Sequence, residues 1–130
     1  REDLSMLGYA AASDVFGASL YEPCGQIDQT GNLFAATATN RDIGGYHDKI
    51  DELRWEGNGF LFRDYDPGGL RYGLEKSLAF HRLPLETRTI HMRRITKETM
   101  LKYNLHRMID QYVEVYERLN GGLPLNHNVQ

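Results

Sequence analysis

Short runs of strand-forming residues alternate with helix-forming segments in the first half of this chain, and this alternation limits the possible folds most. Strands are expected over 15–21, 36–40 and 59–63, and helices over 3–12 and 26–35. Strands that alternate with helices are typical of α/β proteins with a parallel sheet. We therefore predict an α/β fold with a short parallel sheet of about three strands, half of a doubly wound domain, which has about six.

The second half of the chain is expected to be helical. Asp66 and Pro67 are a favourable N-cap and first residue for a helix over 67–82. Helices over 85–101 and 104–119 follow. The last helix carries a continuous apolar stripe, made of Leu105, Ile109, Tyr112, Tyr116 and Leu119.

Apolar residues recur at helical spacing in two of these segments. Leu33 and Phe34 are expected to face inward from the helix over 26–35. Leu70, Leu74 and Leu78 are four residues apart, so they lie on one face of their helix.

The composition is that of an ordinary globular protein, because 130 residues with 41% apolar and 25% charged side chains have room for one domain. The net charge of −3 is too small to indicate nucleic acid or an anionic membrane as a partner. No apolar run reaches the roughly 18 residues of a membrane helix. The single cysteine, Cys24, excludes an internal disulfide framework and favours a reducing compartment, the cytoplasm. Because the chain begins at Arg1 rather than at Met, we expect it to be an excised piece of a longer one.

The charges are distributed unevenly. Residues 1–66 carry 5 Lys/Arg and 12 Asp/Glu, a net −7, whereas residues 67–130 carry 10 and 6, a net +4. The basic stretch over 82–107 is interpreted either as a surface that faces an anion or a glucan, or as a solvated helical face. The second interpretation is favoured, because charge runs on helices mostly lie on the surface.

The segment Tyr21-Glu22-Pro23-Cys24-Gly25-Gln26 is where chemistry is most to be expected. It lies where a strand should pass into a helix, and open α/β sheets bind ligands outside the carboxyl ends of their strands. The backbone N–H groups of Gly25 and Gln26 would sit at a helix N-terminus, which suits a phosphate or sugar oxygen. Glu22 would project into the same crevice and accept hydrogen bonds from vicinal hydroxyls.

A second segment, Ile43-Gly44-Gly45, falls in a long loop expected over 41–58 and could admit a ligand against bare backbone. On pattern alone, a purely structural turn is the favoured interpretation of each segment.

Taken together, the motifs resemble those of the glycogen and starch synthases, which transfer glucose from a nucleotide sugar to an α-1,4-glucan. That family carries an aromatic residue and Glu-Pro-Cys-Gly after a buried strand, followed downstream by Gly-Gly, and here Gly44 lies 22 residues after Glu22. Residues 59–62, Gly-Phe-Leu-Phe, match its Gly-Phe-x-Phe strand. Tyr112, Tyr116 and Leu119 match its closing Tyr-x-x-x-Tyr-x-x-Leu helix, so the resemblance runs from about Leu4 to Leu119.

The resemblance implies a GT-B glycosyltransferase, in which two Rossmann-like domains enclose the active site. Residues 1–120 would be the C-terminal portion of the donor-binding domain and residues 121–130 a C-terminal tail. The partners implied are ADP-glucose or UDP-glucose, an α-glucan and the rest of the same polypeptide, with no metal and no redox cofactor. The isolated chain is expected to be inactive.

Carried over by position, the family's glutamate is Glu22, which contacts hydroxyls of the transferred glucose. The donor-binding positions are Cys24, Gly25, Gln26, Thr30, Gly44 and Gly45.

The sequence departs from the family pattern at several positions. Gln26 replaces a leucine, and Thr30 replaces an acidic or aromatic residue near the ribose. The strand over 37–40, Thr-Ala-Thr-Asn, is polar where relatives are apolar, Leu105 replaces a tryptophan, and the Pro-Ser before the Glu-Pro-Cys-Gly motif is missing.

Two other functions remain open from the residues. One is a non-catalytic module, derived from such a domain, that binds a glucan or a protein partner. The other is a structural interaction domain built on the stripe of the last helix. Self-association is expected as well, because a three-stranded sheet cut from a larger one would leave an unpaired strand edge and uncovered apolar surface.

Four further residues have a favoured structural interpretation or stay open between two. Cys24 at a helix start could be nucleophilic, but the sequence places no histidine near it. His47 and Asp48 are too few ligands for a metal ion. Trp55 either stacks on a sugar ring or covers the loop.

Overall fold

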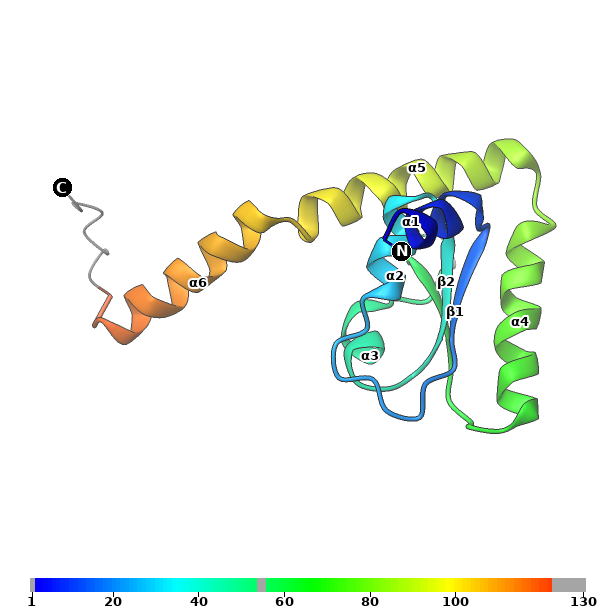
Figure 1. The fold of residues 1–130 in the computed structure, drawn as a ribbon, viewed down its shortest axis with the longest axis horizontal. Coiled ribbons are helices and arrows are strands. Elements are labelled where there is room, and N and C mark those ends of the chain that lie inside the picture. The colour runs from blue at the N-terminus through cyan, green and yellow to red at the C-terminus, as the bar shows by residue number, and fades with distance from the viewer. Residues whose placement is uncertain (1, 54–55, 123–130) are drawn as a thin grey trace. The chain divides into compact units, whose positions relative to one another are not determined.

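The computed structural model describes residues 2–53 and 56–122, so Trp55 and most of the expected tail over 121–130 lie outside the described residues. The chain divides into two units, residues 1–99 and residues 100–130, which are described separately. The elements in chain order are α1 (Glu2–Ala11), β1 (Asp14–Gly17), α2 (Ile27–Leu33), β2 (Thr37–Arg41), α3 (Gly45–Lys49), β3 (Gly59–Phe62), α4 (Pro67–His81), α5 (Leu85–Lys102) and α6 (Leu105–Leu119) (Figure 1).

The first unit is built on a parallel sheet with the strand order β1-β2-β3. Val15 and Gly17 of β1 pair with Ala38 and Asn40 of β2, and Ala38 pairs in turn with Gly59 of β3. Helices α2 and α3 lie on one side of the sheet and α4 on the other (Figure 1). The predicted α/β class and the short parallel sheet of three strands are confirmed.

Strand β1 is shorter than the sequence indicated. It ends at Gly17, and the segment over 18–26 is a loop in which Leu20 and Tyr21 are 64% and 79% exposed. The Arg41 guanidinium donates to the carbonyls of Ser19 (3.4 Å) and Leu20 (3.2 Å), which in a longer strand would accept from backbone N–H groups of β2. The Arg41 side chain therefore ends the backbone pairing of β1 with β2 at Gly17, an end that the apolar run over 15–21 did not predict.

Helix α3 occupies part of the segment over 41–58, where only a loop was expected. Tyr46 within it and Ile50 just after it are buried and pack against Ala38 of β2. The expectation was wrong because the helical period in this segment rests on only two apolar residues, too few to distinguish from chance.

A second apolar cluster joins β3, α4 and α5. Phe60, Phe80 and Ile95 form it with Leu53, and Ile95 is fully buried. Full burial of such a side chain stabilises the fold by about 1.5–3 kcal/mol, which fixes the middle of α5 to the first unit.

Helix α4 packs on the sheet through its small residues rather than through its leucines. Its N-cap is Asp66, as predicted, and its buried residues are Gly69, Gly73, Ser77 and Phe80. A Cβ at Gly73 would lie 2.8 Å from Phe62, so helix and sheet are in close contact there. Leu70, Leu74 and Leu78 are 38%, 44% and 51% exposed, and Leu33 of α2, expected to face inward, is 42% exposed.

Two polar residues of β2, Thr37 and Thr39, are explained by a partly buried carboxylate in β1. Asp14 Oδ2 accepts hydrogen bonds from the hydroxyls of Thr37 (2.9 Å) and Thr39 (3.0 Å) in β2, and also from Ser77 of α4. His81 Nε2 lies 3.9 Å from the same oxygen. Burial raises the pKa of the Asp14 carboxyl, although the three hydroxyls and His81 act in the opposite direction.

Replacing Asp14 by asparagine should change how stability depends on pH. Because the pKa of Asp14 is raised on folding, the folded chain holds this proton more tightly, and the native free energy of unfolding falls as pH rises from about 3.8 through the folded pKa. Asp14→Asn cannot ionise and should gain stability relative to the native chain over that interval. Urea unfolding of both chains between pH 3 and pH 7 measures the difference. A difference that is constant with pH would contradict the assignment.

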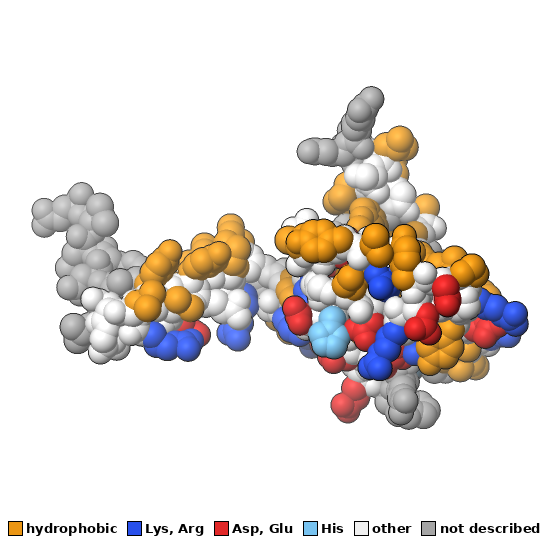
Figure 2. Space-filling model, turned by 90° about the horizontal axis from the view of Figure 1, so that it is seen from below, with side chains coloured by type: hydrophobic (Ala, Val, Ile, Leu, Met, Phe, Trp, Pro, Cys, Tyr) orange, Lys and Arg blue, Asp and Glu red, His pale blue; other side chains and the backbone are white. Residues whose placement is uncertain are grey.

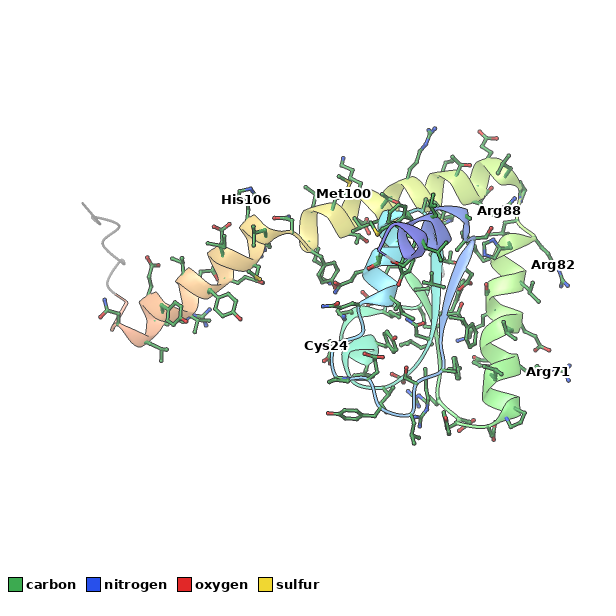
Figure 3. The ribbon with its side chains drawn as sticks, in the orientation of Figure 1. Cys24, Arg71, Arg82, Arg88, Met100 and His106 are labelled. Carbon is green, nitrogen blue, oxygen red and sulfur yellow. The ribbon has the colours of Figure 1, made fainter. Side chains whose placement is uncertain are left out.

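The basic stretch over 82–107 contains at least one residue with a structural task. Arg94 donates from its guanidinium to the carbonyls of Glu56 (2.8 Å) and Gly57 (2.6 Å). Arg82, by contrast, points away from the sheet (Figure 3). The favoured interpretation of the stretch as a solvated helical face stays a prediction.

The second unit contains α6, an amphipathic helix. It begins at the N-cap Asn104, whose side chain accepts from the N–H of Arg107 (2.9 Å). None of its residues, all of which the structure describes, is buried. Its exposed apolar side chains gather along one side, with charged residues on the other (Figure 2), and comprise Leu105, Met108, Ile109, Tyr112, Val115, Tyr116 and Leu119. A structural interaction domain built on this stripe stays a prediction.

None of the helices within the described ranges combines the length and the apolarity that crossing a membrane requires.

Candidate functional site

Two loops meet at the carboxyl ends of β1 and β2. The N–H of Gly45 donates to the carbonyl of Glu22 (3.1 Å). A Cβ on Gly44 would come closer than 3.0 Å to the Glu22 carbonyl oxygen, and one on Gly45 equally close to that of Cys24. Gly44 also has φ +49°, a conformation that favours glycine. The structure thus brings the Glu-Pro-Cys-Gly and Gly-Gly segments together. The loop that carries Glu22 and Cys24 packs directly against the backbone of Gly44 and Gly45.

The Glu22 carboxylate is held by three donors. Oε1 accepts from the N–H of Gly25 (3.0 Å), and Oε2 accepts from the hydroxyls of Ser19 (3.2 Å) and Tyr46 (3.3 Å). These bonds, with that from Gly25 foremost, lower the pKa of the Glu22 carboxyl, so the group is negative at neutral pH. A carboxylate offers about four acceptor positions, which leaves about one for a ligand hydroxyl.

Two expectations about Glu22 need correction. It does not end a strand, because it lies five residues beyond Gly17, the last residue of β1. The N–H of Gly25 is not free for a phosphate or sugar oxygen, because the Glu22 carboxylate itself accepts from it. Both differences follow from the loop over 18–26, which curls back so that a glutamate and the glycine three residues later form a local turn.

Gly25, Gln26 and Thr30 surround the start of α2. Gly25 is buried with φ +59°, and the ring of Tyr46 lies where its side chain would be. Gln26 is the N-cap of α2, but its side chain makes no capping hydrogen bond. The Thr30 hydroxyl donates to the carbonyl of Gln26 (3.0 Å), within the same helix. Cys24 is an exposed free thiol on the loop that precedes α2 (Figure 3).

Helix α3 holds this loop in place from the other side. Lys49 donates from Nζ to the carbonyls of Cys24 and Gly25, and it lies 3.8 Å from the buried carboxylate of Asp28. Burial raises the pKa of Asp28, and the Lys49 charge opposes that effect. Ser19, Tyr46 and Lys49 were missed by the sequence reasoning. Tyr46 and Lys49 follow Gly-Gly and are three residues apart, a spacing that places two side chains on one face of a helix. This spacing is the signal in the sequence that could have identified them.

His47 pairs with Asp42 rather than with its neighbour Asp48. Its Nδ1 lies 2.6 Å from Asp42 Oδ1, and this contact raises the pKa of His47. Arg63 holds the other oxygen of Asp42 at 3.2 Å. Among the residues that the structure describes, no group of three or more His, Cys, Asp or Glu side chains could hold a metal ion.

Comparisons with known proteins place this geometry in a family context. No protein-family model matches the chain. The glycogen synthase of Geobacillus thermodenitrificans is 29% identical over 122 residues, which cover 92% of this chain and 24% of that enzyme. The catalytic domain of starch synthase IV from Arabidopsis thaliana, bound to ADP and acarbose, matches with a TM-score of 0.76 and 27% identity over 91% of this chain and 24% of that one. The chain is similar to the glycogen and starch synthases over most of its length.

This relation confirms the resemblance read from the motifs, and the parallel α/β fold is the one expected for a GT-B glycosyltransferase domain. Sucrose-phosphate synthase from Thermosynechococcus elongatus shares the fold, with a TM-score of 0.66 at 20% identity over 90% of this chain and 28% of that one. The chain spans about a quarter of the length of the curated glycogen synthases that it matches. The segment that it shares with these synthases includes both loops of the candidate site.

Proposed function

We propose that this chain is the donor-side part of a retaining glucosyltransferase that moves glucose from ADP-glucose or UDP-glucose to an α-1,4-glucan. The observation that carries the proposal is the Glu22 carboxylate, charged and held in place beside Gly44 and Gly45, in a chain related to glycogen synthases over most of its length. The related starch synthase IV was solved with ADP and acarbose, which supports a nucleotide and a glucan as ligands.

In this proposal, Glu22 acts by orienting the sugar. Its remaining acceptor position takes a hydroxyl of the transferred glucose, while Gly25, Ser19 and Tyr46 keep the carboxylate from rotating. Holding a reactant in its reactive geometry lowers the barrier without any covalent step by the protein. The charge that develops on the leaving diphosphate needs fixed donors, and we assign these to the part of the synthases that this chain does not match.

Titration of the isotope-labelled chain tests the donor site. ADP-glucose or UDP-glucose should shift the amide NMR signals of residues 22–26 and 44–45, with a dissociation constant on the order of 1 mM. Glu22→Gln should weaken this binding, and a control change at exposed Arg71 of α4, on the opposite side of the sheet from α2 and α3, should not. Shifts with maltoheptaose alone would favour the second candidate, a non-catalytic glucan-binding module. Shifts with none of the three ligands would contradict both.

The same preparation is expected to transfer no glucose. Catalysis by positioning requires both the groups that hold the diphosphate and those that hold the acceptor glucan. This chain matches only about a quarter of the length of its relatives. Incorporation of labelled glucose into glycogen measures the activity. Elongation of glycogen by the purified 130-residue chain would contradict the proposal that this chain supplies only the donor side of the active site.

A further inference from the structure

We propose that Lys49 is a positioning residue for Glu22 and acts through the peptide group that joins Cys24 to Gly25. The Lys49 ammonium donates to the carbonyl oxygen of this peptide group, and the N–H of the same group donates to the Glu22 carboxylate. The lysine thereby strengthens the hydrogen bond that fixes the carboxylate. The inference rests on the proposed function only for the task that it gives to Glu22.

The two hydrogen bonds are made at the two ends of one peptide group. Lys49, the last residue of α3, donates from Nζ to the carbonyl of Cys24 and also to that of Gly25. The backbone nitrogen of Gly25 lies 3.0 Å from Glu22 Oε1. In a trans peptide the carbonyl and the N–H point in opposite directions. The lysine and the carboxylate therefore bind the same rigid plane from its two ends.

A peptide group that accepts a hydrogen bond at its carbonyl becomes a stronger donor at its N–H, because hydrogen bonds in a chain polarise one another. A cation is the stronger kind of donor, and the Lys49 side chain is only 15% exposed, so water screens its charge little. The Gly25 N–H is also the group that contributes most to lowering the pKa of Glu22. A stronger Gly25 donor therefore keeps the Glu22 carboxylate ionised and oriented.

A buried carboxylate holds the ammonium at this peptide group. Asp28 of α2 is 1% exposed, and its Oδ1 has no hydrogen-bond partner among the residues that the structure describes. Lys49 Nζ lies 3.8 Å from that oxygen. A carboxylate that has lost its hydration needs a nearby cation. Asp28 thus explains why Lys49 extends toward the loop over 18–26 instead of into solvent.

The pKa of Glu22 in the 130-residue chain, read from its carboxyl carbon NMR signal, measures the positioning role. Lys49→Met removes the ammonium and keeps the length of the side chain, so the Glu22 pKa should rise toward its ordinary value of 4.5. Lys49→Arg keeps a charged donor and should restore the low pKa. A Glu22 pKa that is the same in the native chain and in Lys49→Met would overturn the proposal.

Lys76→Met is the matched control. Lys76 also donates to a backbone carbonyl, that of Leu61, and pairs with a carboxylate, that of Glu52, but it lies on α4, on the other side of the sheet. Its loss should leave the Glu22 pKa unchanged. A rise as large as that in Lys49→Met would show a general effect of removing a lysine and would overturn the proposal.

The amide signal of Gly25 separates an effect through the peptide group from a charge that acts through space. The titratable groups that act on Glu22 are Tyr46 and Lys49 of α3 and Asp28 of α2. At pH 7, where Glu22 is ionised, Lys49→Met should move the Gly25 amide proton upfield and speed its exchange with solvent. A Glu22 pKa that rises while the Gly25 signal stays in place would overturn the role of the peptide group.

If Lys49→Met does not fold, the native chain still decides the question. A scalar coupling across the hydrogen bond should join Lys49 Nζ to the carbonyl carbon of Cys24, and the ammonium protons should exchange slowly. Ammonium protons that exchange as fast as those of exposed Lys97 would overturn the proposal. No ligand enters these experiments. Their failure therefore leaves the nucleotide-sugar titration untouched, and failure of that titration leaves the restraint on the Glu22 carboxylate standing.

Discussion

Glucosyl transfer should fall roughly 10- to 150-fold when Glu22 is replaced by glutamine in an active enzyme that contains this chain, because a charge-assisted hydrogen bond to the sugar becomes a neutral one. The enzyme is made by exchanging the 122 aligned residues of the Geobacillus thermodenitrificans glycogen synthase for this chain. The loss should appear in kcat if the hydrogen bond is stronger in the transition state than in the bound substrate. It should appear in KM if the bond stabilises both states equally.

The matched variants separate a role in the reaction from a role in folding. Glu22→Gln keeps an oxygen that can accept from Gly25, so the melting temperature should change little. Glu22→Ala removes the acceptor of all three donors, so it should lower the rate further and also loosen the loop over 18–26. If Glu22→Ala unfolds the domain while the folded fraction turns over at the native rate, Glu22 is structural and the site assignment fails.

Gly45→Ala is expected to destabilise the 130-residue chain by about 3 kcal/mol. The new Cβ would come closer than 3.0 Å to the carbonyl oxygen and carbon of Cys24. These are backbone atoms and cannot rotate away, so the two loops of the site must separate. Separation of the loops would break the hydrogen bond from the Gly45 N–H to the Glu22 carbonyl and the hydrogen bond from Lys49 Nζ to the Cys24 carbonyl.

The control for this substitution is Gly8→Ala in α1. A Cβ there meets nothing within 4 Å, and Gly8 lies inside a helix. Alanine should therefore stabilise the chain by about 0.5–1 kcal/mol. Urea unfolding measures both changes. A Gly45→Ala chain as stable as the native one would mean that the two loops are not in contact in solution.

Local signals in the sequence predicted the order of the elements and the class of fold. Alternating strand-like and helical segments gave the three parallel strands, and Asp66-Pro67 marked the start of α4. The Glu-Pro-Cys-Gly and Gly-Gly segments were expected to share one site, and they are in contact. The element order and the cap depend on residues that are near one another in the chain, where periodicity and capping operate, whereas the shared site was implied by the family resemblance.

Side-chain partners that are distant in sequence decided the rest. The end of β1 depends on Arg41, 24 residues beyond Gly17, and the apolar run over 15–21 carries no trace of it. The leucines of α4 are exposed because glycines, which add nothing to an apolar pattern, allow the closest packing on the sheet.

The setting of Glu22 is likewise a property of the tertiary structure. Its acceptor positions are filled by a local N–H and by the hydroxyl of Tyr46, which α3 brings from 24 residues away. Sequence alone identified the carboxylate, because a glutamate in that motif is a local feature. How many hydrogen bonds it can still accept depends on the packing of α3 against β2, because that packing brings the Tyr46 hydroxyl to the carboxylate.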